Sequence, residues 1–123
     1  MKKYTSSKLA IALLLSLASS QVMAVGALAI DDNQGSRYGF SYDYDNTYDA
    51  RNRALSECGS GCTVVVDFDS GCAAYAADQT AGSSVYGWGQ DSTESRAKNR
   101  ALSECAGHGG SNCVIRVWGC NSR

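Results

Sequence analysis

Apolar and polar residues in the first half of the chain follow a succession of patterns, each typical of one secondary-structure element. Small and apolar residues at 26–31 predict a short strand, and aromatic residues at every second position from 38 to 44 predict another. An apolar stripe with helical spacing predicts a helix over about residues 47–58, and Asn46 is suited to cap its free amide groups. β-Branched residues at 63–68 predict a closing strand.

The same patterns recur in the second half. Residues Asn52–Cys58 reappear letter for letter as Asn99–Cys105, and flanking matches continue in the same order on both sides. The corresponding elements are expected at residues 73–78, 85–90, 93–105 and 114–118. One unit alone could not bury the face of its small sheet. We therefore predict an α+β fold, a tandem ββαβ repeat with pseudo-two-fold symmetry, whose sheets either join or pack face to face. The units are expected at about 25–71 and 72–123.

The N-terminus has the pattern of an export signal. Basic residues at its start precede an apolar run at 9–17, and Val22-Met23-Ala24 resembles a signal-peptidase site. A run of about nine residues is well short of the roughly 20 needed to span a bilayer. We expect residues 1–24 to be a secretory signal peptide cleaved after Ala24. Residues 25–123 would form a single exported domain, periplasmic or extracellular, with no membrane insertion.

Six cysteines behind an export signal indicate a disulfide framework. A metal site is the poorer interpretation, because the cysteine spacings do not suit zinc and the chain has one histidine. Six cysteines allow 15 pairings, and the symmetry of the units selects one of them. Two bridges would each tie a helix end to the following strand, while the third would join equivalent positions and bridge the units. The predicted pairs are Cys58–Cys62, Cys105–Cys113 and Cys72–Cys120.

Several of these motifs together resemble a known family. The small-residue strand Gly26–Ile30, the aromatic strands Tyr38–Phe40 and Tyr86–Trp88, the helices ending A-x-x-x-A-L-x-x-C and the closing Val117–Asn121 are similar to those of the bacterial domain-of-unknown-function 4189 family. The resemblance covers residues 26–121. It implies a secreted or periplasmic α/β domain with paired cysteines. It brings no established activity, so it assigns no catalytic residue.

Charge narrows the possible partners. Without residues 1–24 the chain keeps all 12 acidic residues and eight of its 11 basic ones, a net charge of about −4. No segment gathers enough Lys or Arg to follow a phosphate backbone, so nucleic-acid binding is disfavoured. Attraction to an anionic membrane surface is disfavoured for the same reason.

No catalytic group or cofactor site is predicted. His108 lies in a glycine-rich insertion that positions side chains poorly, and we expect it to be a solvated loop residue. Glu57 and Glu104 occupy equivalent positions, and a pseudo-two-fold axis could bring them together as a carboxylate pair. Each also lies four residues after an arginine, which makes a surface ion pair the more ordinary interpretation.

Acidic residues cluster in two places, at Asp31-Asp32-Asn33 and at Asp43, Asp45 and Asp49. Alternating oxygen donors of this kind can wrap calcium, but neither cluster has the full loop pattern with its closing glutamate. Turn formation and helix capping account for these residues, so no metal site is predicted.

Aromatic residues supply the best functional lead. Those present in both units are expected in the core: Tyr38, Phe40, Tyr86 and Trp88. The others, Tyr42, Tyr44 and Tyr48, have no aromatic counterpart in the second unit and stand among aspartates. Tyrosines exposed beside polar groups are common anchors at binding surfaces, so these three are predicted to bind a partner.

These observations favour a disulfide-stabilised binding module for a protein or glycan partner, in an inhibitor, immunity-type or host-interface role, without catalytic activity or cofactor. Two alternatives stay open. One is a small secreted hydrolase acting on cell-envelope polymers through Glu57, Glu104 or His108. The other is a structural envelope protein without a tight soluble partner.

Overall fold

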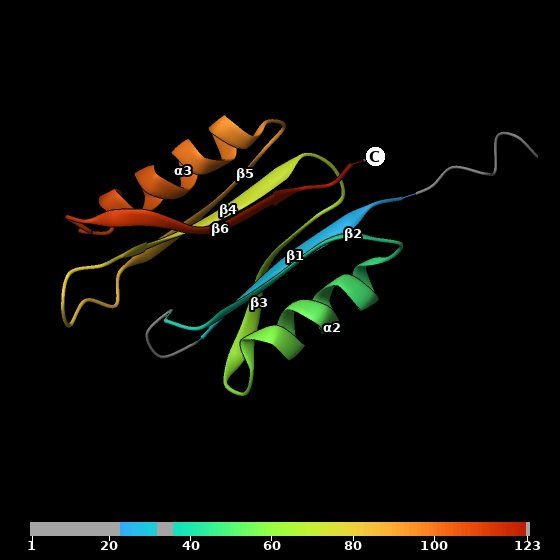
Figure 1. Cartoon of the computed structure of the whole chain (residues 1–123), viewed down its shortest axis with the longest axis horizontal. Helices are drawn as coiled ribbons and strands as arrows, with labels where there is room; N and C mark the ends of the chain where they lie inside the picture. Colours follow the sequence, from blue (N-terminus) through green and yellow to red (C-terminus); the bar gives the residue numbers. More distant parts are fainter. Residues whose placement is uncertain (1–22, 32–35, 123) are drawn as a thin grey trace, which may run out of the picture.

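Two copies of a strand–strand–helix–strand unit make up the structure, a computed structural model that describes residues 23–31 and 36–122 (Figure 1). The first unit consists of β1 (Val25–Asp31), β2 (Tyr38–Tyr44), α2 (Thr47–Cys58) and β3 (Cys62–Phe68). The second consists of β4 (Cys72–Asp78), β5 (Tyr86–Asp91), α3 (Glu94–Gly107) and β6 (Cys113–Cys120). The tandem ββαβ repeat and the α+β class predicted from the sequence are confirmed.

The predicted signal peptide falls almost wholly outside the described residues, as do Asp32 and Asn33 of the first acidic cluster. Among the residues that the structure describes, no helix is long and apolar enough to cross a membrane.

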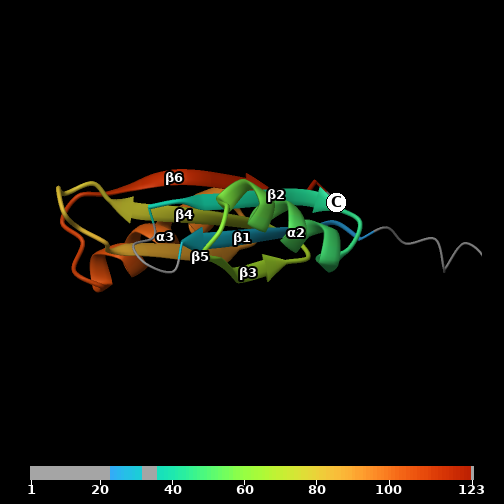
Figure 2. The same cartoon turned by 90° about the horizontal axis from the view of Figure 1, so that it is seen from below.

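The sheets stack as the two middle layers of a four-layer sandwich. Their strand orders are β2-β1-β3 and β5-β4-β6, and each central strand runs antiparallel to both neighbours. Helix α2 covers the outer face of the first sheet and α3 that of the second (Figures 1 and 2). Of the two arrangements left open by the sequence, the structure has the sheets face to face.

Each central strand is buried on both faces, and its alternate residues enter different cores. In β1, Leu28 and Ile30 face the other sheet, while Ala27 and Ala29 lie under α2. In β4, Tyr75 faces the first sheet, and the alanines on either side of it lie under α3. Large side chains therefore fill the space between the sheets, and small ones let the helices approach. Burial raises the pKa of Tyr75 to about 12.

Glycine in the aromatic strands has a packing role. A Cβ atom at Gly39 would overlap the Ala54 carbonyl of α2, and one at Gly87 would overlap the Cys105 nitrogen of α3. The aromatic residues beside these glycines point the other way and pack against the core between the sheets, as expected. The tyrosine–glycine–aromatic motif thus serves two interfaces at once.

A β-bulge overturns one expectation about the aromatic strand. Between Val25 and Ala27 of β1, the pairing with β2 shifts from Tyr44 to Ser41, and Asp43 has a φ of 63°. The extra residue turns Tyr44 to the opposite face, where it packs beneath α2. The prediction that Tyr44 shares a face with the other aromatic residues of this strand is therefore wrong.

All six cysteines form disulfides in the predicted pairs: Cys58–Cys62, Cys105–Cys113 and Cys72–Cys120. The expectation that Cys72–Cys120 bridges the two units is wrong. The bond joins directly opposite residues of β4 and β6, so it closes the second unit into a covalent ring. Strands β4 and β6 belong to the same unit and run antiparallel, so the end of β6 lies beside the start of β4.

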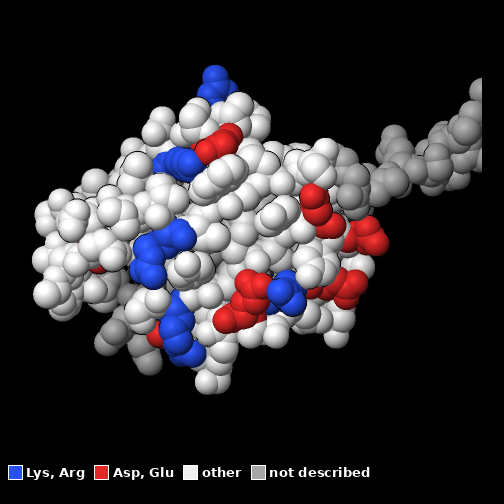
Figure 3. Space-filling model, viewed as in Figure 1, with Lys and Arg blue, Asp and Glu red and all other residues white. Residues whose placement is uncertain are grey.

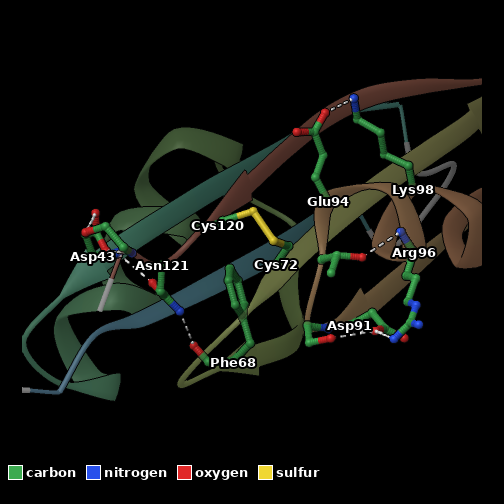
Figure 4. Close-up of a disulfide and its surroundings, with 12 residues drawn as sticks. Asp43, Phe68, Cys72, Asp91, Glu94, Arg96, Lys98, Cys120 and Asn121 are labelled. Atoms are coloured by element: carbon green, nitrogen blue, oxygen red, sulfur yellow. Dashed lines mark hydrogen bonds and ion pairs between the residues drawn. A yellow bond between two sulfur atoms is a disulfide. The ribbon is translucent and has the colours of Figure 1, made fainter.

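Asn121 supplies the bridge that the disulfide does not. Its side-chain oxygen accepts the Asp43 backbone N–H at 2.8 Å, and its side-chain nitrogen donates to the Phe68 carbonyl at 3.0 Å. The next residue, Ser122, donates from its backbone N–H and hydroxyl to the Asp43 carboxylate, at 2.7 and 2.9 Å. Figure 4 shows Asn121 between Asp43 and Phe68, beside the Cys72–Cys120 bond. The C-terminal segment of the second unit is thus hydrogen-bonded to the bulge of the first.

Candidate functional site

Hollows follow one another along the edge strand β5, where it meets the outer side of α3. One, of about 390 Å³, is lined by residues 84–88 together with Glu104 and His108. The next, of about 610 Å³, shares Trp88 and Glu104 with it and continues over Gly89 and Gln90 toward Asn99, Arg100 and Ser103 of α3. Because they share lining residues, these two hollows form one groove, which we call the β5–α3 groove.

Within the seven-residue segment that the two helices share, the arginine makes different ion pairs in the two units. In α2, Arg53 Nε lies 2.9 Å from Glu57 Oε2, and Glu57 Oε1 accepts the backbone N–H of Phe40 on edge strand β2 at 3.3 Å. In α3, the equivalent Arg100 instead donates from Nε to Asp91 at 2.8 Å.

The bulge in β2 explains this difference. Asp43 and Asp91 occupy equivalent positions, three residues after Phe40 and Trp88, but the bulge turns the Asp43 side chain toward Ser122. Arg53 therefore pairs with Glu57, and the pair covers the edge of β2. Asp91 faces α3 and pairs with Arg100, so none of the described arginines pairs with Glu104. The Arg100 hydrogen bond, assisted by the Ser92 N–H, lowers the pKa of Asp91.

Glu104 and His108 meet at one end of the groove. His108 Nε2 lies 4.0 Å from Glu104 Oε1, and His108 Nδ1 lies 3.1 Å from the Tyr86 carbonyl oxygen. Both side chains are about 60% exposed, so water competes with the contact between them. His108 caps the end of α3. His108 is exposed in the turn after α3, as expected of a solvated loop residue, and its imidazole in addition contacts the edge strand.

The structure does not gather the three tyrosines predicted to bind a partner. Tyr48 in the first turn of α2 is 74% exposed, and Tyr42 is 50% exposed. Tyr42 packs against Phe40 and lies close to Gly119 of β6, at the rim of the space between the sheets. Tyr44 lies on the opposite face of β2, so the three do not form one patch.

Glu57 and Glu104 are likewise kept apart. Helices α2 and α3 lie on opposite outer faces of the sandwich, with both sheets between them (Figure 1). The pseudo-two-fold axis therefore does not bring these glutamates together, and they are not a carboxylate pair of the kind that glycoside hydrolysis uses.

The acidic clusters have structural partners. Asp49 accepts from Asn46 at the start of α2, and Asp43 binds Ser122. No group of three or more His, Cys, Asp or Glu residues within 23–31 and 36–122 is placed to hold a metal ion. On the face drawn in Figure 3, basic side chains lie mostly toward the left and acidic side chains mostly toward the right, with opposite charges side by side in several places.

Sequence reasoning missed the groove. The feature that could have indicated the groove is a difference between otherwise matching units. Asp91 ends a strand without a bulge, and the second unit has a longer segment between helix and closing strand, which contains His108. Neither difference identifies a site until the ion pairs of the two helices are compared.

The fold and groove define a class: a disulfide-linked α+β domain with a duplicated ββαβ unit and a groove along one of its edge strands. The model of a protein family described as a domain of unknown function (DUF4189) matches residues 25–120. The chain belongs to this family. Comparisons with curated proteins and with solved structures gave no significant match.

Proposed function

We propose that the protein is an exported binding module that holds a protein or glycan partner in the β5–α3 groove, without catalytic activity. The observation that carries the proposal is the contrast between the units. The same seven-residue helix sequence covers the sheet edge in the first unit and leaves it open in the second. A scaffold held by three disulfides in a small domain fits an oxidising compartment and presents such a groove in a fixed shape.

The duplication supplies a matched control for testing the groove. Ser103 is exposed and lines the groove, and Ser56 is its equivalent on α2. An arginine at position 103 would occupy the groove, whereas one at position 56 would project from a covered edge. Both are exposed helix positions, so we expect Ser103→Arg and Ser56→Arg to unfold at the same temperature as the unmodified protein.

The experiment is a pull-down from cell-envelope and culture-medium fractions, followed by mass spectrometry. Partners captured by the unmodified protein should be retained by Ser56→Arg and lost by Ser103→Arg. Capture of the same partners by Ser103→Arg would show that the groove is not the binding site. The exposed tyrosines are tested in the same assay: Tyr48→Ala should weaken capture if that ring is an anchor.

One observation favours a second candidate, a small secreted hydrolase acting on cell-envelope polymers. Glu104 and His108 line the same hollow, where a carboxylate and an imidazole could share acid–base work. Hydrolysis of peptidoglycan that is lost in Glu104→Gln and kept in Glu57→Gln would replace the binding proposal with this one.

A further inference from the structure

The backbone of β5 presents unpaired hydrogen-bonding groups to the groove. The Asp78 N–H donates to the Val85 carbonyl at 2.9 Å, which makes Asp78 and Val85 a hydrogen-bonded pair of the β4–β5 ladder. Pairs alternate along an antiparallel ladder, so Gly87 and Gly89 bond to β4, and the N–H and C=O groups of Trp88 and Gln90 point outward. Within the described residues, these outward groups have no hydrogen-bonding partner.

The equivalent edge of the first unit confirms this alternation and shows how an edge is protected. Phe40, the counterpart of Trp88, points its N–H outward, and Glu57 accepts it. Farther along β2, Asn121 accepts the Asp43 N–H. Open sheet edges promote unwanted pairing, and proteins usually cover them. The β2 edge is covered at two points, whereas among the described residues the only side-chain contact to an outward backbone group of β5 is that of His108 with the Tyr86 carbonyl.

We propose that an extended peptide segment of a partner protein adds to β5 as a fourth strand of the second sheet, lying in the β5–α3 groove. This inference rests on the proposed function and specifies the chemistry of the partner. The outward groups of Trp88 and Gln90 would exchange backbone hydrogen bonds with alternate residues of the added strand. The imidazole of His108 on the Tyr86 carbonyl marks one end of the added pairing.

Side chains of the added strand would alternate between the two faces of the sheet. Those on the helix side would meet Asn99, Ser103 and Glu104. Glu104 lacks an arginine partner within the described part of the chain, whereas the charge of Arg100 is matched by Asp91. A lysine or arginine opposite Glu104 is therefore the preferred residue at that position.

The groove favours a peptide over the other possible occupants. Glycan sites usually offer an exposed aromatic ring, but the Trp88 ring packs against the core between the sheets and leaves its backbone at the edge. A second copy pairing β5 with β5 around Trp88 would bring two Glu104 carboxylates close together without a compensating charge.

The test uses the disulfide-bonded protein and a phage-displayed library of random dodecapeptides. Selected peptides should bind the unmodified protein and Ser56→Arg, and binding to Ser103→Arg should be at least tenfold weaker. In saturated complexes, the amide protons of Trp88 and Gln90 should become protected from hydrogen exchange. N-Methylation of one peptide nitrogen facing β5 should weaken binding about tenfold, and methylation of its neighbours should not.

The outcomes separate the two proposals. Equal sensitivity to methylation at every nitrogen, or unchanged exchange of the Trp88 amide, would overturn strand addition. Binding of envelope oligosaccharides to the unmodified protein but not to Ser103→Arg would overturn strand addition and support the groove as a binding site. A dimer in sedimentation that Ser103→Arg dissociates would assign the edge to a second copy and overturn the peptide proposal. Selected peptides that bind Ser103→Arg normally would overturn both proposals.

Discussion

Removing the Cys72–Cys120 disulfide should destabilise the protein more than removing either of the others. This bond closes a loop with a sequence separation of 48 and holds the whole second unit in one ring, whereas Cys58–Cys62 spans a separation of 4. The entropy that a cross-link removes from the unfolded chain grows with the logarithm of the loop length. That relation gives about 4 kcal/mol for the long loop and about 2 kcal/mol for the short one.

The two bonds are matched in their surroundings, which makes the comparison fair. Each joins one cysteine that is 4% exposed, Cys58 or Cys72, to one that is partly exposed. The packing lost when both cysteines become alanine should therefore be similar in the two double variants. The difference between their stabilities should reflect loop length and be about 2 kcal/mol.

The measurement is urea unfolding of the double variants Cys72→Ala/Cys120→Ala and Cys58→Ala/Cys62→Ala without reductant. The long-loop variant should also show the larger increase in the dependence of the free energy of unfolding on urea, because its unfolded state expands more. Cys105→Ala/Cys113→Ala, with a separation of 8, should fall between the two at about 2.5 kcal/mol. A loss in the short-loop variant equal to that in the long-loop variant would refute the entropic argument.

Three further predictions concern packing, the bridge between the units and pH. Gly87→Ala should destabilise the protein by about 1–3 kcal/mol in urea unfolding, because its Cβ would overlap α3. Gly107→Ala, at the end of α3 in open space, should be neutral or stabilising by up to about 1 kcal/mol. Equal effects of the two substitutions would contradict the close approach of β5 to α3. Asn121→Ala should lower the free energy of unfolding by about 1–3 kcal/mol, because it removes the partner of the Asp43 N–H and of the Phe68 carbonyl. Ser122→Ala should lower it less, because the hydroxyl hydrogen bond that it removes is exposed. The reverse order would argue against Asn121 as the bridge between the units. Hydrogen bonds from Ser83, Thr80 and Asn112 lower the pKa of Asp78 to about 2 from an ordinary value of 3.8. The stability that this carboxylate contributes should therefore be present above about pH 4 and lost as the pH falls toward 2. Thermal melts across this range should be flatter for Asp78→Asn, and an unchanged slope would show that these bonds do not stabilise the fold.

The duplication places one identical seven-residue helix segment in two units, where its arginine and glutamate make different contacts. Asn52–Cys58 and Asn99–Cys105 have the same local preferences and form the same amphipathic helix. What differs is the aspartate that each strand offers to the arginine of its helix. One aspartate is turned away by a bulge and the other is not, and the covered or open state of each sheet edge follows from that.

The sequence by itself determined the repeated unit, its order of elements and the pairing of the cysteines. Strand alternation and helical stripes are local periodicities, and duplication of the whole unit constrains which cysteines are equivalent. These features do not depend on knowing what packs against them, so local periodicity was enough for the elements and comparison of the two units was enough for the cysteine pairs.

Only the tertiary structure decided the stacking of the sheets, the face taken by Tyr44, the strands joined by Cys72–Cys120 and the opening of the β5–α3 groove. Asp43 illustrates the reason. Its backbone N–H is bound by Asn121, 78 residues later in the chain, and its carboxylate by Ser122. A local pattern cannot reveal which distant group will complete a hydrogen bond, and here that choice determines which way a strand turns and which sheet edge is left open.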